Sequence, residues 1–183
     1  ILSFSLFIFV NENFITHDSS HYMSIARNLH NGKGFITRSV ALIPLRPEKI
    51  PYPDHTHPPF YSIILFIPYS LFGINVYSAS IVNIFLSSFI APLTFLLAIK
   101  VFDSKNLALL AAALVTFDWI LIKNKGFILT QLPYALFTLL FFILLYKAKN
   151  WFHYISLGVI IGLAYLTRYQ AIYLFFPIFL LYE

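Results

Sequence analysis

The sequence predicts an all-α membrane protein: a polytopic helix bundle with an extracytoplasmic loop that carries short juxtamembrane helices. Hydrophobic residues make up 60% of the chain and charged residues only 10%, whereas a soluble domain carries roughly a quarter charged residues. The apolar residues form blocks that approach the roughly 20 residues needed to cross a bilayer. Short polar turns separate these blocks, so we expect successive helices to run in opposite directions.

The net charge and the absence of cysteine limit the kinds of site and partner that the chain can have. The formal net charge is +5 and cysteine is absent, which excludes disulfides and thiolate metal sites within these residues. In a chain this apolar, a basic excess indicates membrane orientation and contact with anionic lipids. We therefore expect membrane lipids, and not nucleic acid, as partners.

Both ends of the sequence look interrupted. Residues 1–10 are apolar but too few to cross a membrane, so we expect them to be the last half of a first transmembrane helix. The final residues are equally apolar and stop within or just after another helix. Residues 1–183 are thus expected to form part of one transmembrane domain, with 11–73 as the extracytoplasmic loop and 76–183 as further transmembrane helices.

The polar part of the loop spans residues 11–56. Asp18 can cap a helix over 19–29. The apolar residues of this helix recur at i, i+3, i+4 and i+7, a pattern that suits a helix lying on the membrane surface. Prolines predict irregular structure over 35–56; they are Pro44, Pro47, Pro51 and Pro53.

The apolar blocks after the loop predict helices over 57–73, 76–99, 107–122, 127–146, 151–166 and 169–182. The first block is short and contains Pro68, so it either spans the membrane or lies on its surface. The surface position puts Lys100, Lys105, Lys147 and Lys149 in the cytoplasm, which the positive-inside rule favours by four cations against three. It also brings Asp18, Gln131 and Arg168 to one outer face.

Four charged residues stand out as candidates for chemistry. Asp18 at the water interface suits a general base, although its spacing favours a plain helix cap. Arg168 and Lys123, next to apolar helices, suit either a lipid phosphate or a snorkelling interfacial anchor. Asp118 lies inside an apolar block, where an acid is a functional candidate or a partner of a nearby cation.

The loop is also rich in histidine. With Asp54, the histidines could gather around a divalent metal ion; they are His17, His21, His55 and His57. No metal-ligand signature with strict spacing is present, so exposed interfacial histidines are the simpler interpretation. We therefore predict no metal site.

A series of short motifs runs along the chain in a characteristic order. It comprises Asp18-Ser19-Ser20-His21-Tyr22, Ile25-Ala26-Arg27, Asn31-Gly32-Lys33-Gly34, His57-Pro58-Pro59-Phe60-Tyr61, Leu71-Phe72-Gly73, Leu110-Ala111-Ala112-Ala113-Leu114, Thr130-Gln131-Leu132-Pro133 and Gly162-Leu163-Ala164-Tyr165-Leu166-Thr167-Arg168. The series resembles that of the GT-C class of lipid-linked-sugar glycosyltransferases, the group of protein O-mannosyltransferases and aminoarabinose transferases. The sequence departs from this pattern at Ser19 and Gln131, where relatives often carry an acid.

The resemblance implies a hexosyltransferase of the cell (plasma) membrane, with its active site on the extracytoplasmic face and no cofactor. The donor would be a polyprenyl-phosphate-linked sugar, and the acceptor a protein, lipid or glycan. Asp18 would be the catalytic base of an inverting transfer, and Arg168 would lie near the donor phosphate. The other residues expected to bind substrate are Tyr22, His57, Pro58, Lys123 and Gln131.

A non-enzymatic membrane protein is the alternative, either a transporter or a lipid-handling or scaffold subunit. A transporter is expected to place polar groups at mid-membrane in broken helices, whereas this sequence concentrates them at one surface. The missing second acid keeps the scaffold subunit open as an alternative.

Overall fold

The computed structural model of the chain describes residues 15–38, 50–54 and 56–180. The predicted end of a first helix at 1–10, and His55 of the histidine group, lie outside the described residues. Pro44 and Pro47 do so as well.

The described residues are mostly helical and contain almost no sheet, which confirms the all-α prediction. The elements are α2 (His17–His30), β1 (Ile36–Thr37), β2 (Tyr52–Pro53), α3 (Phe60–Phe72), α4 (Val76–Ser87), α5 (Ile90–Phe102), α6 (Lys105–Thr116), α7 (Trp119–Asn124), α8 (Gln131–Lys147), α9 (Trp151–Thr167), the 3-10 helix η1 (Tyr169–Phe175) and α10 (Phe176–Leu180). The two short strands pair antiparallel, with Ile36 opposite Pro53. The irregular loop predicted over 35–56 therefore contains a small β-ladder.

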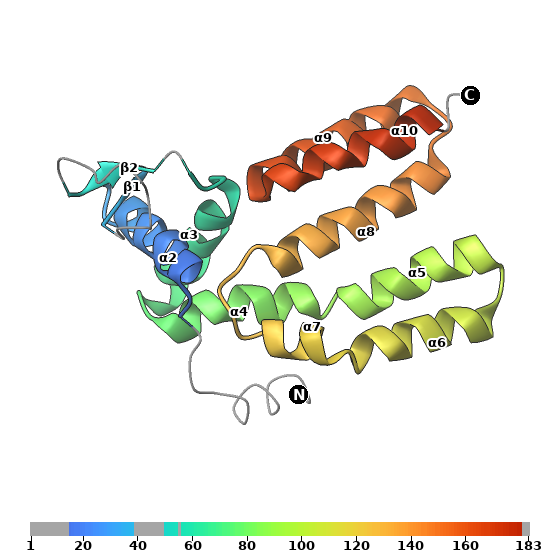
Figure 1. Cartoon of the computed structure of the whole chain (residues 1–183), viewed down its shortest axis with the longest axis horizontal. Helices are drawn as coiled ribbons and strands as arrows, with labels where there is room; N and C mark the ends of the chain where they lie inside the picture. The colour runs from blue at the N-terminus through green and yellow to red at the C-terminus, as the bar shows by residue number, and fades with distance from the viewer. Residues whose placement is uncertain (1–14, 39–49, 55, 181–183) are drawn as a thin grey trace.

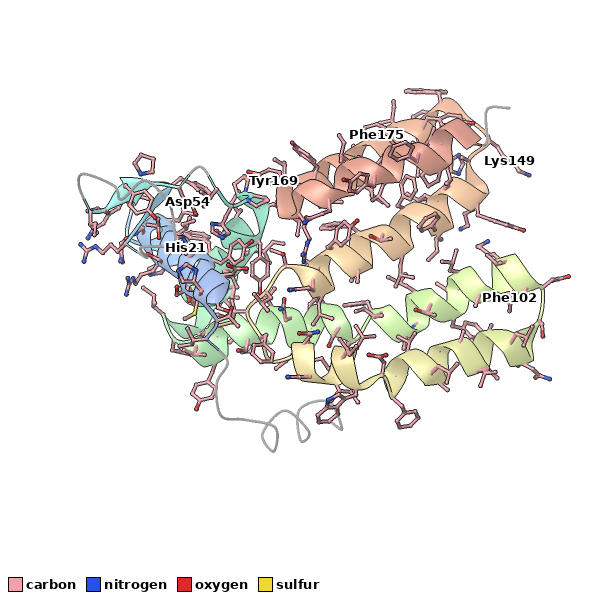
Figure 2. All side chains as sticks on the ribbon, viewed as in Figure 1. His21, Asp54, Phe102, Lys149, Tyr169 and Phe175 are labelled. Carbon is pink, nitrogen blue, oxygen red and sulfur yellow. The ribbon has the colours of Figure 1, made fainter. Side chains whose placement is uncertain are left out.

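The chain forms a head and a bundle (Figure 1). The head consists of α2, α3 and the two strands, and the bundle consists of α4 to α10. The turns between α5 and α6 and between α8 and α9 lie at the bundle end far from the head. Figure 2 marks these turns with Phe102 and Lys149, while Tyr169 lies at the end next to the head.

The apolar stripe of α2 packs on α3 and not on a membrane surface, which corrects the prediction for this helix. Tyr22 and Ala26 of α2 share one buried cluster with Tyr61 and Leu65 of α3. Val82 of α4 belongs to the same cluster, so the head is joined to the first helix of the bundle. This packing fixes the position of α2 relative to the helices that follow.

The N-terminal cap of α2 is Thr16, so the prediction that Asp18 caps this helix is wrong. The Thr16 backbone is extended, and its hydroxyl accepts a hydrogen bond from the Ser19 amide at 3.2 Å. Asp18 lies inside the first turn with its side chain 61% exposed. A carboxylate in the first turn still interacts favourably with the helix dipole, but it remains free to face other groups.

The long apolar run after the head is interrupted once, at Ser88-Phe89, between α4 and α5. Taken as one run, Val76–Phe102 is the single described helix whose length and composition suffice to cross a membrane. The other apolar helices of the described chain have 10–17 residues. Crossing of the membrane by the whole bundle therefore remains a prediction.

The helix predicted over 107–122 is broken by Asp118. The backbone of Asp118 is extended, and its carboxylate accepts a hydrogen bond from the Leu121 amide at 2.8 Å. An aspartate in this conformation is a favourable N-cap, so α6 ends and α7 begins here. Among the described residues Asp118 forms no ion pair with Lys123 or Arg168, and the expected intramembrane acid is a helix cap.

The arrangement of helix ends matches the one expected if 57–73 stays beside the loop. α3 covers Phe60–Phe72 with Pro68 in its interior, and it packs against α2 and α4. The α7–α8 connection and the end of α9, which Arg168 follows, lie toward the head. Lys100 and Lys147 lie in the last turns of α5 and α8, whose ends are far from the head. Polar groups distant in sequence thus meet at the head.

Candidate active site

A small pocket opens where the head meets the bundle. It has a volume of about 150 Å³ and is lined by Asp18, Tyr22, Pro58, Leu129, Thr130, Gln131, Thr167, Arg168, Tyr169 and Gln170. Five residues that the sequence suggested for one site therefore line this one pocket, although some are far apart in the chain: Asp18, Tyr22, Pro58, Gln131 and Arg168. The larger cavity of about 600 Å³ at the far end is mostly apolar; its lining is Leu97, Val101, Phe142, Leu145, Tyr146, Ala148, Tyr154 and Ile178. Of these two, the smaller pocket is the one that carries charged side chains.

Asp18 enters the pocket from the first turn of α2. Its Oδ1 lies 3.8 Å from His57 Nε2 and 4.0 Å from His17 Nδ1. The carboxylate therefore faces a histidine on one side and the open pocket on the other. A group in this position can accept a proton from a hydroxyl bound in the pocket.

His57 is held by a buried carboxylate on its other side. Its Nδ1 lies 3.0 Å from Asp54 Oδ2, and the Asp54 side chain is only 1% exposed. The amide and hydroxyl of Thr56 donate to Asp54 Oδ1 at 2.8 and 2.6 Å. Asp54 is therefore bonded through both carboxylate oxygens.

The contacts between Asp54 and His57 lower the pKa of the carboxyl and raise the pKa of the imidazole. Burial acts to raise the pKa of Asp54, but the hydrogen bonds from His57 and Thr56 outweigh it and leave that pKa well below its usual range. Burial acts to lower the pKa of His57, but the hydrogen bond and charge of Asp54 and the charge of Asp18 raise it. Both shifts of pKa stabilise the charged forms of Asp54 and His57 relative to their neutral forms.

Tyr22 forms the floor between the pocket and the head. Burial raises its pKa to about 12, against the opposing effect of a hydrogen bond with Thr130. The hydroxyl therefore stays protonated at neutral pH. The ring packs edge-on against His57 and Tyr61, with centroids 5.1 Å apart in each case, and so fixes the orientation of His57.

Arg168 supplies the positive charge of the pocket. It follows the last residue of α9 in an extended conformation, and its amide bonds to the Ala164 carbonyl at 2.7 Å. Its Nε donates to the Gln170 side chain at 3.1 Å. No carboxylate of the described residues pairs with it, so the guanidinium can receive an anionic ligand.

The three remaining predicted residues differ in exposure and in the pocket that they line. Pro58 is buried in the pocket wall, and Gln131 is exposed at the start of α8. Lys123 does not line the pocket; it lines a neighbouring one of about 430 Å³ that shares Leu129. Lys123 and Asp18 therefore line two different pockets.

Sequence reasoning overlooked two buried threonines of the pocket. Thr130 and Thr167 are 6% and 0% exposed, and each directly precedes a residue that was singled out, Gln131 or Arg168. The signal that could have found them is this adjacency at a helix end, where a hydroxyl often meets ligands or unpaired backbone groups.

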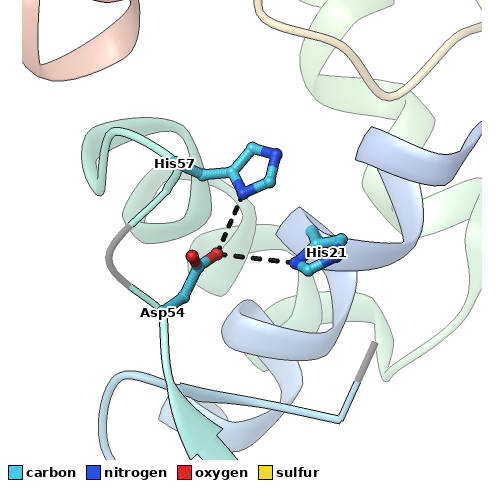
Figure 3. A group of neighbouring side chains, drawn as sticks. All are labelled: His21, Asp54 and His57. Atoms are coloured by element: carbon cyan, nitrogen blue, oxygen red, sulfur yellow. Dashed lines mark hydrogen bonds and ion pairs between the residues drawn. The ribbon is translucent and has the colours of Figure 1, made fainter. Parts of the chain in front are cut away.

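A group of three metal-type ligands adjoins the pocket. His21, Asp54 and His57 each offer a donor atom, and these atoms lie within 4.8 Å of one another (Figure 3). His17 has its ring 5.2 Å from that of His21, at the exposed rim. The described part of the predicted histidine group therefore does converge, through helix α2 and the segment before α3.

Comparisons with known proteins place the chain in a family. The family model described as dolichyl-phosphate-mannose-protein mannosyltransferase matches residues 57–182, a range that includes His57, Pro58, Gln131 and Arg168 and begins after Asp18 and Tyr22. An uncharacterized protein of Aquifex aeolicus (strain VF5) is 30% identical over 118 residues, a stretch that covers 62% of this chain and 23% of that protein. The chain thus matches less than a quarter of that relative's length.

No solved structure matches the chain. The family match covers residues 57–182, which are more than half of the 183 residues, and this coverage is sufficient to assign the chain to a family. The chain belongs to the dolichyl-phosphate-mannose-protein mannosyltransferase family.

Proposed function

We propose that this chain contains the catalytic pocket of a membrane glycosyltransferase that moves a sugar from a polyprenyl-phosphate donor to an extracytoplasmic acceptor. The observation that carries the proposal is the shared pocket of Asp18 and Arg168, a proton acceptor and an anion-binding cation. The family match supports the reaction class. The transferred sugar is a hexose, and the acceptor offers a hydroxyl group.

The two charged groups divide the chemistry of the transfer between them. The acceptor hydroxyl attacks the anomeric carbon while Asp18 takes its proton. The bond from that carbon to the phosphate oxygen breaks on the opposite face, so the configuration inverts. The leaving polyprenyl phosphate gains negative charge, which the Arg168 guanidinium stabilises by charge-assisted hydrogen bonds.

The neighbouring residues position these two groups. His57 faces Asp18 with Nε2 while Asp54 holds its Nδ1, and it thus orients the carboxylate toward the pocket. Tyr22, Pro58 and Gln131 line the space between Asp18 and Arg168 and bind the sugar or its phosphate. Lys123 in the adjoining pocket attracts the lipid phosphate into this region.

The proposed membrane orientation puts the head on the extracytoplasmic side of the cell membrane and the far turns in the cytoplasm. The outer surface of the bundle supports a bilayer environment, because its helices expose large apolar side chains that a soluble protein would bury; among them are Leu110, Leu114, Phe152, Val159, Ile172 and Phe176. Four lysines at the far end, Lys100, Lys105, Lys147 and Lys149, accord with a cytoplasmic location.

Substitution of the proposed base tests the function. In membranes containing the full-length protein, incubated with radiolabelled polyprenyl-phosphate hexose, Asp18→Asn is expected to abolish transfer of label to an acceptor. Asp103→Asn is the matched control: Asp103 ends α5 in a left-handed conformation that asparagine also adopts, and it should leave transfer unchanged. Full transfer by Asp18→Asn would refute the assignment of the base, and absence of transfer by the unmodified protein would favour a transporter or scaffold.

A further inference from the structure

Asp54 has its two carboxylate oxygens in different environments. Oδ1 accepts both hydrogen bonds from Thr56. Oδ2 faces two imidazole nitrogens instead, His57 Nδ1 at 3.0 Å and His21 Nδ1 at 3.6 Å. The Thr56 bonds therefore orient the carboxylate so that one oxygen points between the two rings, as the dashed lines in Figure 3 show.

His21 is buried, yet its two ring nitrogens lack hydrogen bonds within the described part of the chain. Its side chain is 0% exposed, and neither ring nitrogen has a hydrogen-bond partner among the described residues. Buried polar side chains are hydrogen-bonded in the large majority of cases, and each exception calls for an explanation such as an ion. A buried imidazole nitrogen that faces a fixed carboxylate oxygen at 3.6 Å, beyond hydrogen-bond distance, is what a metal ligand presents.

We propose that His21, Asp54 and His57 form a binding site for a divalent transition metal ion of the zinc class. Two imidazole nitrogens and one carboxylate oxygen are donors that zinc takes readily. At bond lengths of about 2.0–2.1 Å, the donors around a tetrahedral zinc ion lie about 3.3 Å from one another. The two distances to Asp54 Oδ2, 3.0 and 3.6 Å, bracket that separation.

The stacking of the two rings and the bonds from Thr56 to Asp54 suit the same ion. The rings of His21 and His57 are stacked, with centroids 4.7 Å apart and planes inclined by 27°, so their Nδ1 atoms approach Asp54 from neighbouring directions. Thr56 supplies the outer hydrogen bonds that usually orient a ligating carboxylate. His57 is 16% exposed, which leaves water access to the fourth position. Binding requires a deprotonated Nδ1 on His57, so it would release any proton held there.

The ion would have a structural consequence for the pocket. His21 lies on α2, whereas Asp54 and His57 lie on the segment between β2 and α3. A metal bridge would tie this segment to α2 and hold His57 Nε2 next to Asp18. The site is independent of the proposed sugar transfer, because it is assigned from donor atoms and burial alone.

Metal titration of purified full-length protein tests the proposal. After removal of metal with a chelator, the protein is titrated with Zn²⁺ and, separately, with Co²⁺, whose visible absorption reports tetrahedral coordination. The unmodified protein should bind zinc at this site. His21→Phe keeps a ring in the buried space but removes both nitrogens, and it should abolish this binding. The matched control is His30→Ala, an exposed histidine on the same helix, which should bind zinc as the unmodified protein does.

A second variant keeps the test valid if His21→Phe fails to fold, as judged by its thermal unfolding without metal. Thr56→Val removes no ligand; it removes the hydroxyl bond to Asp54 and the hydroxyl contact with His57 Nδ1 at 2.8 Å. Loss of an outer hydrogen bond weakens metal binding about 10–100-fold. Equal zinc affinity of Thr56→Val and the unmodified protein would overturn the proposal. So would a folded His21→Phe that still binds zinc, or an unmodified protein that binds none. Sugar transfer is measured separately, so failure here leaves the proposed function untouched.

Discussion

The buried Asn83 of α4 connects the head, α4 and the segment that carries the pocket threonine Thr130. Its side-chain amide donates to the carbonyls of Phe127 and Leu129, the latter at 2.9 Å. Its oxygen accepts a hydrogen bond from the Tyr61 hydroxyl at 3.1 Å. Asn83 is fully buried, so no water replaces these partners when the amide is removed. We therefore expect Asn83→Leu, which keeps the branched shape of the side chain but removes all three bonds, to destabilise the protein.

The magnitude follows from the number of bonds. Net hydrogen bonds contribute about 1 kcal/mol each in soluble proteins, and about 0.6 kcal/mol on average between membrane helices. Three bonds thus give about 2–3 kcal/mol for Asn83→Leu, by the same per-bond values. Tyr61→Phe removes only one of them and should cost about a third as much. Sugar transfer should fall with Asn83→Leu as well, because Leu129 and Thr130 line the pocket.

Reversible unfolding of the full-length protein in mixed micelles measures both variants, with Ser88→Ala as the control. Ser88 lies in the same apolar run, but it is exposed and bonds only to the nearby Phe85 carbonyl. The reasoning is refuted if Asn83→Leu is as stable as the unmodified protein. It is equally refuted if Tyr61→Phe costs as much as Asn83→Leu, since the bond count would then not determine the effect.

Two further predictions concern the pocket cation and the orientation of the bundle. Arg168→Ala should lower sugar transfer about 10²–10³-fold, as does loss of other donors to a developing negative charge. The control is Arg38→Ala, at an exposed arginine of the head, which should leave transfer unchanged. Equal rates for Arg168→Ala and the unmodified protein would exclude Arg168 from the phosphate site. Single cysteines report orientation, since these residues contain none of their own. In intact cells a membrane-impermeant maleimide should label Lys33→Cys in the head and should label Lys105→Cys only after permeabilisation, and the reverse pattern would invert the proposed topology.

Local sequence determined much of the secondary structure. Apolar blocks free of charge predicted α4 with α5, α8 and α9, and the polar residues between them predicted the turns. Asp103, Ser104 and Asn150 end or cap helices at these turns. These features are predictable because caps and hydrophobic runs act over a few residues. Asp18 and Asp118 show the limit of this local prediction, since an aspartate at either position could cap a helix. Asp118 does cap α7, but α2 is capped by Thr16 and not by Asp18. The backbone conformation at each position decides which side chain reaches an amide.

The composition of the candidate site was decided in part by the sequence and in part by the fold. The motif series predicted Asp18, Tyr22, Pro58, Gln131 and Arg168 as residues of one site, and the structure places them around one pocket. It sets Lys123 in the neighbouring pocket and adds the buried Thr130 and Thr167. Residue type indicates what a side chain can do, but the walls of a pocket depend on how helices distant in sequence pack.

What the sequence determined by itself is the helical class, the order of the helices and the residue types able to transfer a proton or bind a phosphate. Only the tertiary structure decided that α2 packs on α3, that the buried Thr130 and Thr167 join Asp18 and Arg168 in the lining of one pocket, and that His21 is buried beside Asp54. The physical reason is the range of the interactions. Helix formation and capping are set by neighbours within a turn or two, whereas burial of His21 and the opening of the pocket result from packing between segments that no local pattern relates.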